Sequence, residues 1–299
     1  MITMLRVLEH LLRTQALANR WLLRGENWLE GLALGALDHD ERRLLTDRLY
    51  SYWRPAPDYA GGLFDWEQRW FEADLPIQPA RVLIGGVGSG RELAWFETRR
   101  DRIVAFEPVS ELLELARAAS QSRQTTLLAG GYEELIADRR RELLDGWRPE
   151  PPGTLGANPT PLARVVAENA PYDAVVLGWG SFTHVVETSV RLALLRRARE
   201  LCPRGPLLTS FWMRPADSVF DRGTSFSLGA SLGDWLRRLR DRPQTEIENG
   251  DHFVPALGFG HRFSASEFAQ LAETSDYRII RAPRAGGGYP HATLSPKIE

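Results

Sequence analysis

The chain has 299 residues and a formal net charge of −2, with 43% hydrophobic and 25% charged residues, which is typical of a globular protein. The balance of 37 basic and 39 acidic residues argues against binding nucleic acid through a broad basic surface. Lys297 is the only lysine, which disfavours Schiff-base and P-loop lysine chemistry. Cys202 is the only cysteine, which excludes an internal disulfide and a cysteine-based metal site.

The histidines and the N-terminal residues further limit the classes of protein that the sequence fits. The six histidines form no His-x-His or His-Glu-x-x-His pattern, so the sequence predicts no metal site. The first 23 residues carry charged side chains at helical intervals and lack the unbroken apolar core of a signal peptide. Because no segment approaches the roughly 20 apolar residues that span a bilayer, we expect a cytoplasmic protein that does not enter a membrane.

Residues 1–75 predict a helical cap, because apolar residues recur every three or four positions. Asp38–Asp40 can begin a second helix that runs through Leu49. Eight aromatic residues then fall between Tyr50 and Phe71, interrupted by prolines and glycines. Two roles are open for this aromatic segment, which includes Tyr59: packing on the next domain, or lining a ligand pocket as a lid.

From residue 76 the pattern changes to strands that alternate with helices. The predicted strands of this part are residues 81–84, 102–106, 125–129, 172–177 and 205–213. The predicted helices between them are residues 91–99, 110–120, 133–144 and 186–201, with a Pro- and Gly-rich insertion at about 146–170. This alternation indicates a parallel sheet that is covered on both faces.

The last third of the chain completes the predicted domain of residues 76–299. Residues 214–262 break the alternation and are interpreted as a substrate-side insertion. A helix follows at 264–274, and two antiparallel strands at 277–282 and 289–294 close the fold. We therefore expect an α/β fold: a Rossmann-like, doubly wound sheet of seven mostly parallel strands with an antiparallel last strand, plus the N-terminal helical cap.

The most informative motif is a glycine loop in residues 82–92, where a buried strand leads into Gly86-x-Gly88-x-Gly90 and then a helix. Glycines allow a ligand to approach the backbone, and a helix N-terminus supplies free N–H groups. Glu107 ends the next strand, where a carboxylate can accept hydrogen bonds from both ribose hydroxyls of a nucleoside. The order of strand, loop, helix, strand and acid predicts a nucleoside site.

The spacing of the glycines indicates which nucleoside. The dinucleotide fingerprint needs Gly or Ala where Arg91 stands, which disfavours a nicotinamide oxidoreductase. Residues 76–213, and more weakly 262–295, instead resemble the class I S-adenosylmethionine-dependent methyltransferases. The resemblance implies S-adenosyl-L-methionine as the cofactor, with these contacts: Gly86, Gly88, Gly90, Glu107, Pro108, Tyr132, Gly178 and Trp179. The sequence departs from the family at Ile84, where an acid is usual, and at Gly131-Tyr132, where Tyr132 would stack on or flank the adenine instead of an acid.

Residues 172–184 resemble the fourth-strand motif of the same family, which faces the methyl group and the substrate. His184, just beyond this strand, is the candidate general base, with packing as its alternative role. The candidate substrate contacts are Tyr59, Ser181, Thr183, Arg214 and His261.

The sequence therefore predicts an enzyme that transfers a methyl group to O or N of a small-molecule acceptor by in-line displacement. One alternative is a non-catalytic nucleoside-binding or partner protein of the same fold, which Ile84 suggests. Another is an RNA methyltransferase, which is disfavoured because the chain has no basic extension and no Asn-Pro-Pro-Tyr motif. The sequence leaves open whether two copies form a homodimer.

Overall fold

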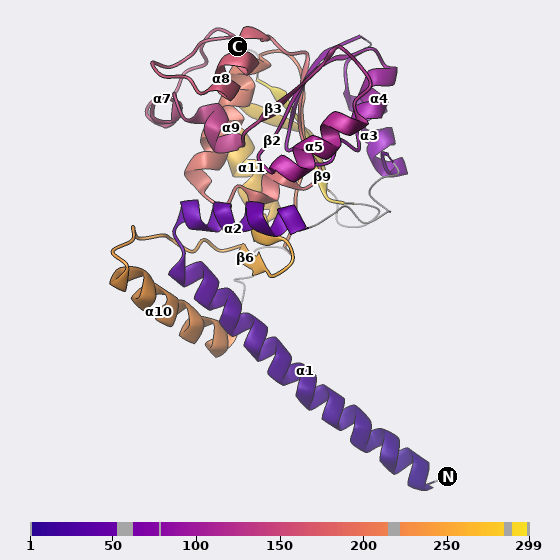
Figure 1. The fold of residues 1–299 in the computed structure, drawn as a ribbon, viewed down its shortest axis with the longest axis vertical. Helices are drawn as coiled ribbons and strands as arrows, with labels where there is room; N and C mark the ends of the chain where they lie inside the picture. Colours follow the sequence, from indigo (N-terminus) through magenta and orange to yellow (C-terminus); the bar gives the residue numbers. More distant parts are fainter. Residues whose placement is uncertain (1, 53–61, 78, 215–221, 284–288, 298–299) are drawn as a thin grey trace.

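The computed structural model describes residues 2–52, 62–77, 79–214, 222–283 and 289–297 (Figure 1). In the first helix it describes the side chains of Gln15 and of the residues from 17 onward. Among the described residues, no helix combines the length and the apolar character needed to cross a membrane.

Seven strands form one sheet in the order β3-β2-β1-β4-β5-β9-β8. The strands are β1 (Arg81–Gly85), β2 (Arg102–Glu107), β3 (Thr125–Ala129), β4 (Ala174–Leu177), β5 (Leu207–Ser210), β8 (Tyr277–Arg281) and β9 (His291–Pro296). Neighbours among β1–β5 are parallel, whereas β9 pairs antiparallel with both β5 and β8. The strand order reverses at β1, as in a doubly wound sheet, so the predicted fold class is confirmed down to its antiparallel last strand.

Helices cover both faces of the sheet. Successive side chains of a strand point to opposite faces, so each strand contributes to the core on both sides. Val82 and Ile84 pack on one face, whose core includes side chains of α3, α4 and α5, while Leu83 packs on the other. The three helices on the face of Val82 and Ile84 are α3 (Asp65–Asp74), α4 (Leu93–Thr98) and α5 (Ser110–Ala119). The opposite face carries α6 (Tyr132–Ile136), α7 (Arg140–Leu144), α8 (Pro161–Glu168), α9 (Thr188–Leu201) and α11 (Ala265–Thr274).

Two long helices, α1 (Ile2–Ala36) and α10 (Gly223–Leu239), pack side by side and away from the sheet (Figure 1). The shorter helix α2 (His39–Tyr52) crosses between this pair and the sheet. The N-terminal part of α1 projects beyond its partner, and Trp21, near the middle of the helix, is 69% exposed. The helical character predicted for the N-terminal residues is therefore present in α1, α2 and α3.

The sequence prediction was incomplete for residues 214–262, which hold α10 and a hairpin of β6 (Asp251–Val254) and β7 (Gly258–His261). Gly229 and Gly233 weaken the helix signal, since glycine is a poor helix former. In the folded chain they allow close packing: a Cβ on Gly229 would lie 2.1 Å from the carbonyl oxygen of Trp28. Packing between α1 and α10 thus stabilises a helix whose glycines give it a low intrinsic helix propensity.

Two smaller differences concern residues 133–170. The helix predicted at 133–144 is divided into α6 and α7. The insertion at about 146–170 contains α8, whose first turn is capped by Thr160, as its Oγ1 accepts a hydrogen bond from the backbone N–H of Ala163 at 3.0 Å. Pro161 follows directly, at the first position of a helix where its missing N–H costs nothing.

Candidate functional site

The glycine loop joins β1 to α4 in the predicted conformation. Gly86, Gly88 and Gly90 have φ values of +66°, +56° and +80°, the region that favours glycine. A Cβ on Gly86 would also lie 2.6 Å from Cβ of Ser181, and one on Gly90 would lie 2.9 Å from Cα of Ala116. Around Gly88, by contrast, nothing lies within 4 Å of an added Cβ. Gly86 and Gly90 therefore allow neighbouring residues to pack closely against the loop, whereas Gly88 borders open space.

Glu107 ends β2 beside this loop. Its Oε2 accepts a hydrogen bond from the backbone N–H of Gly88 at 2.8 Å, and its Oε1 accepts one from that of Val109 at 3.1 Å. The side chain is buried, and this burial raises the pKa of the carboxyl group to about 7 even though both hydrogen bonds lower it. The predicted acid thus directly contacts the predicted glycine loop.

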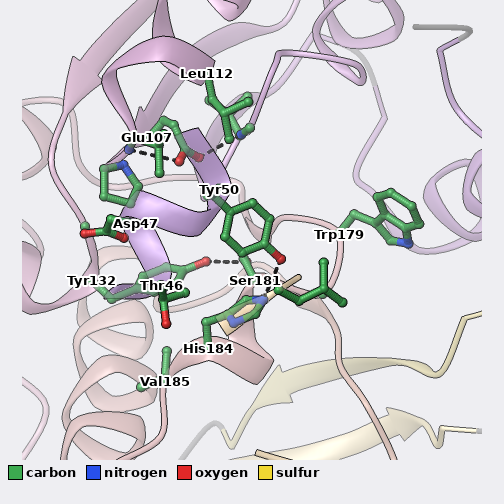
Figure 2. Close-up of a pocket in the computed structure, with 18 of the residues that line it drawn as sticks. Thr46, Asp47, Tyr50, Glu107, Leu112, Tyr132, Trp179, Ser181, His184 and Val185 are labelled. Atoms are coloured by element: carbon green, nitrogen blue, oxygen red, sulfur yellow. Dashed lines mark hydrogen bonds between the residues drawn. The ribbon is translucent and has the colours of Figure 1, made fainter. Parts of the chain in front are cut away.

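Both features open into a cavity of about 570 Å³ at the carboxyl edge of the sheet (Figure 2), where ligands of open α/β folds bind. Eight predicted site residues line the cavity: Gly86, Gly88, Glu107, Pro108, Tyr132, Trp179, Ser181 and His184. Gly90 and Gly178 lie behind the wall; the backbone N–H of Gly178 donates to the carbonyl oxygen of Gly85 at 2.7 Å.

Carboxyl groups outnumber arginines on the cavity wall. Glu92, directly after the glycine loop, is 6% exposed, and burial raises the pKa of its carboxyl group to about 7. Burial also raises the pKa of Glu133. The two arginines of the wall are paired with acids that do not line it: Arg43 with Glu134 and Arg91 with Glu67. A cationic ligand would therefore find more favourable charge here than an anionic one.

The side chains of Tyr132 and Ser181 hold the glycine loop in place through hydrogen bonds. The single proton of the Tyr132 hydroxyl is shared between Oγ of Ser181 at 2.5 Å and the carbonyl oxygen of Gly85 at 3.0 Å. Ser181 Oγ in turn donates to the carbonyl oxygen of Gly178 at 2.8 Å. The Tyr132 ring is buried against the edge of Phe106. This network holds β1, β4 and α6 in register at the cavity floor.

His184 lies in the 3₁₀ turn η2 (Ser181–His184), which follows β4. Its Nε2 is 2.8 Å from the hydroxyl oxygen of Tyr50, and its Nδ1 is 2.7 Å from the carbonyl oxygen of Phe259 (Figure 2). Burial lowers the pKa of His184, although the hydrogen bond to the Phe259 carbonyl opposes this. The imidazole is thus held neutral on the cavity wall.

Three other predicted substrate residues lie away from the cavity wall. Thr183 is fully buried, and its Oγ1 accepts a hydrogen bond from the backbone N–H of Trp212 at 2.8 Å. His261 lies between Asp251 at 2.7 Å and Glu267 at 2.6 Å, and Arg214 pairs with Glu267 at 3.3 Å. These side chains stabilise the sheet edge and the hairpin in the described structure. Tyr59, the remaining candidate, lies outside the described residues.

The cluster around His261 includes groups that bind metals elsewhere: single ligand atoms of Glu248, His261 and Glu267 lie within 4.8 Å of one another. The guanidinium of Arg191 already pairs with both carboxylates, and with Glu267 at 3.9 Å. Hydrogen bonds to Asp251 and Glu267 raise the pKa of His261 against the lowering effect of its burial. The guanidinium of Arg191 and the proton-binding imidazole of His261 thus supply the positive charge that a metal ion would bring to these carboxylates.

One wall of the cavity is formed by α2, and sequence reasoning leaves a lid role open only for the end of this helix, where the aromatic segment begins at Tyr50. Arg43, Thr46, Asp47 and Tyr50 line the cavity from successive turns of one helix face. Trp212, Tyr289 and three residues of the hairpin turn, Val254, Ala256 and Leu257, also line the cavity. The three- and four-residue spacing of the α2 side chains was visible in the sequence, but it did not indicate which face would meet the sheet.

No protein-family model matches this chain, and no curated protein matches it either. Among solved structures, an S-adenosylmethionine-dependent methyltransferase from Leishmania major has a TM-score of 0.50 at 15% identity, over 88% of this chain and 87% of that chain. The 1,6-didemethyltoxoflavin-N1-methyltransferase of Burkholderia thailandensis, with bound S-adenosylhomocysteine, has a TM-score of 0.44 at 16% identity, over 87% and 84%. An amino pentose methyltransferase from Micromonospora echinaspora, bound to S-adenosylmethionine, has a TM-score of 0.41 at 15% identity. The match covers 94% of this chain and 96% of that chain.

The strand order, the glycine loop and the likeness to the Leishmania major structure together define the fold of this chain. It is the fold of the class I S-adenosylmethionine-dependent methyltransferases. At 15% identity the likeness is one of fold, and at that level it confirms the resemblance inferred from the sequence.

Proposed function

We propose that the protein is an S-adenosylmethionine-dependent methyltransferase that acts on an oxygen or nitrogen of a small molecule. The observation that carries the proposal is the direct contact between Glu107 and Gly88 in a cavity at the switch point of the sheet. A carboxyl group that can bind a ribose, open backbone and a helix start then border one cavity, which supports the proposal. Such a set of groups fits a nucleoside ligand.

The charges of the cavity support a cationic nucleoside. S-adenosylmethionine carries a sulfonium and an ammonium group, and Glu92 and Glu107 offer buried carboxyl groups close to the glycine loop. Glu92 can receive the ammonium end in place of the acid that the family has where Ile84 stands. A dinucleotide would instead bring a pyrophosphate next to Glu92, whose carboxyl group would repel it when ionised. This contrast favours the sulfonium nucleoside over a nicotinamide cofactor.

The lining of the cavity supports a small acceptor. Beyond the glycine loop and Glu107, the cavity is lined by α2, η2, the hairpin turn and Trp212, with Tyr50 and Leu257 among the side chains. When bound, the cofactor supplies a methyl group already activated on sulfur, so the protein mainly aligns the reactants and excludes water. In this proposal α2 and the hairpin act as the lid of the site, which leaves room for a small molecule rather than for an RNA helix.

Calorimetric titration with S-adenosylmethionine, S-adenosylhomocysteine and NAD tests the proposal. We expect both sulfur nucleosides to bind and NAD to bind far more weakly. Replacing Glu107 with Gln removes charge-assisted hydrogen bonds and is expected to weaken S-adenosylhomocysteine binding by about 1.5–3 kcal/mol. Glu111→Gln, an exposed position on the next helix, is the matched control and is expected to bind like the wild type. Folded protein that binds neither sulfur nucleoside would overturn the proposal.

The rival proposal of a non-catalytic nucleoside-binding protein makes a different prediction. Such a protein would bind the nucleosides equally well but release no S-adenosylhomocysteine from S-adenosylmethionine in the presence of acceptors. The neutral His184 on the cavity wall favours catalysis, since a neutral imidazole can take up the proton that an alcohol or amine loses on methylation.

A further inference from the structure

Tyr50 and His184 form a pair that joins two distant parts of the chain. Tyr50 belongs to α2 and His184 to η2, and their hydroxyl and Nε2 atoms lie 2.8 Å apart on the cavity wall (Figure 2). The two rings meet edge to face, with centroids 5.2 Å apart and planes at 84°. This geometry directs the ring nitrogen of His184 at the tyrosine hydroxyl, and the hydroxyl lies at the boundary of the cavity.

The direction of each proton follows from the partners. A carbonyl oxygen can only accept, so Nδ1 of His184 carries the hydrogen that it donates to Phe259. A neutral imidazole then has an unprotonated Nε2, and the hydroxyl of Tyr50 must donate to it. The single proton of Tyr50 is therefore committed to His184. Toward any ligand, the phenol oxygen can act only as an acceptor.

Phe259 positions both members of the pair. Its carbonyl oxygen receives the His184 hydrogen bond, while its backbone N–H donates to Oγ1 of Thr46 at 3.0 Å, one turn before Tyr50 on α2. Thr46 Oγ1 in turn donates to the carbonyl oxygen of Arg42 at 2.9 Å. Strand β7 thus fixes the helix that carries the tyrosine and the ring that receives its proton.

We infer that Tyr50, rather than His184, contacts the methyl acceptor, and that the acceptor's nucleophilic atom carries a proton that leaves through Tyr50 to His184. The inference rests on the proposed function and deepens it. Tyr50 is then a catalytic residue, and His184 acts through it as the final proton acceptor.

The proposed transfer is balanced within the site. The acceptor's N or O forms a bond to the methyl carbon as the bond from that carbon to sulfur breaks, and the sulfur retains the electron pair. The acceptor's proton passes to the phenol oxygen of Tyr50 while the phenol's own proton passes to Nε2 of His184. The imidazolium so formed keeps its hydrogen bond to Phe259 and releases the extra proton to solvent when the product leaves.

This arrangement restricts the class of acceptor. A nucleophile without a proton, such as a tertiary amine, a thioether or a thiolate, has nothing to donate to Tyr50. An alcohol, a phenol, or a primary or secondary amine does, and its proton is acidified as the new bond forms. The structure therefore assigns acceptors whose nucleophilic atom bears an O–H or N–H bond.

Nitrogen NMR of the S-adenosylhomocysteine complex tests the proton arrangement without any acceptor. We expect His184, assigned from its absence in His184→Asn, to be the Nδ1–H tautomer at pH 7.5, with the Nε2 resonance shifting in Tyr50→Phe. Tyr52→Phe is the control, because Tyr52 lies on the same helix and is 85% exposed; it is expected to leave the resonance unchanged. An Nε2–H tautomer or an imidazolium would overturn the inference.

Transfer of labelled methyl from S-adenosylmethionine into the small-molecule filtrate of a cell extract tests the order of contact. Tyr50→Phe and His184→Asn are each expected to lower the rate at least 30-fold, and the double variant to be no slower than either single variant. S-adenosylhomocysteine affinity should stay within threefold, which separates catalysis from folding. A Tyr50→Phe variant that keeps the wild-type rate, while His184→Asn loses it, would show that His184 acts on the acceptor directly.

Failure of the proposed function has a different outcome. Wild-type protein that binds neither sulfur nucleoside contradicts the proposed function itself. Wild-type protein that binds them but labels nothing in the filtrate favours the non-catalytic alternative, and the inference about Tyr50 then falls with it. With transfer present, the tautomer and the variant rates decide the inference alone.

Discussion

Arg91 and Glu67 form a bidentate ion pair in which both nitrogen–oxygen distances are 2.6 Å. Their side chains are 6% and 4% exposed. Glu67 also accepts a hydrogen bond from the backbone N–H of Phe64 at the start of α3, and the Arg91 guanidinium lies 5.0 Å from the ring of Trp179. The pair therefore ties α3, the glycine loop and the cavity wall together.

We predict that Glu67→Gln lowers the free energy of unfolding by about 3 kcal/mol. The substitution removes the two-point carboxylate partner of the buried Arg91 guanidinium, and breaking a buried ion pair from one side is costly. Urea unfolding followed by circular dichroism measures the change. Arg91→Lys keeps the charge but loses the two-point contact, so it is expected to be destabilised to a smaller degree.

Glu72→Gln on the same helix is the control for this prediction. Glu72 is exposed and its partner, Gln68, is neutral, so its removal is expected to change stability by less than about 0.5 kcal/mol. Equal loss in the two variants would mean that the charge of Glu67 has no special role.

A second prediction concerns Gly178, at the end of β4. A Cβ added there would lie 2.3 Å from the carbonyl oxygen of Gly86, which is backbone and cannot rotate away. We expect Gly178→Ala to displace the glycine loop, to cost about 1–3 kcal/mol of stability and to weaken S-adenosylhomocysteine binding at least tenfold. Differential scanning calorimetry and calorimetric titration measure the two effects.

Gly88→Ala separates backbone strain from collision. Nothing lies within 4 Å of a Cβ at Gly88, but its φ of +56° strains any other residue. Its stability loss is expected to be about 1 kcal/mol. If Gly178→Ala were the milder of the two, the close approach of β4 to the loop would not be what fixes the loop.

The parts of the fold that could be predicted are those that neighbouring residues encode. Buried runs such as Arg81–Ile84 mark strands, and the order of strand, glycine loop and acid is enough to predict that Gly88 and Glu107 meet at one edge of the sheet. The reason is geometric, since the carboxyl ends of adjacent parallel strands lie side by side. The end of the cavity formed by the glycine loop and Glu107 followed from this rule.

The part of the cavity around Tyr50 and His184 could not be predicted in the same way, because it depends on contacts between distant segments. Arg214 was expected at the substrate because it follows β5, yet it pairs with Glu267. Tyr50 reaches His184 only because α2 crosses the strand ends. One signal was readable and missed: glycines four residues apart occur twice, at Gly31 and Gly35 and again at Gly229 and Gly233, which places two small-residue faces opposite each other.

A third prediction concerns pH. Burial raises the pKa of Glu92 from 4.5 to about 7 in the folded protein. Between these values the unfolded chain loses the proton first, so the folded state loses stability as pH rises from about 5 to 7. Glu92→Gln removes this dependence at one site and is expected to flatten the decline by about 2–3 kcal/mol. Urea unfolding at pH 5, 6, 7 and 8 measures the slope.

Glu114→Gln is the control for the pH series. Glu114 is 70% exposed and pairs with Arg117 on the surface of α5, so its replacement should leave the slope unchanged. S-adenosylmethionine is expected to bind more tightly above pH 7, where Glu92 and Glu107 are ionised. A wild-type slope in Glu92→Gln would mean that this carboxyl group titrates normally.

The pairing of α1 with α10 depends on glycine at Gly229. A Cβ there would lie 2.1 Å from the carbonyl oxygen of Trp28 and 2.9 Å from the backbone nitrogen of Leu32, so the two helices would have to separate. We expect Gly229→Ala to lower the free energy of unfolding by about 1–3 kcal/mol and to speed amide exchange along α10.

The same substitution at Gly25 is expected to have the opposite sign. Gly25 lies in α1, and nothing is within 4 Å of a Cβ added to it. Alanine there gains about 0.5–1 kcal/mol of helix propensity with no collision. The pair of variants thus separates helix propensity, which alanine improves at both positions, from helix–helix contact, which it damages only at Gly229. If both variants were stabilised, the close contact of the two helices would be wrong.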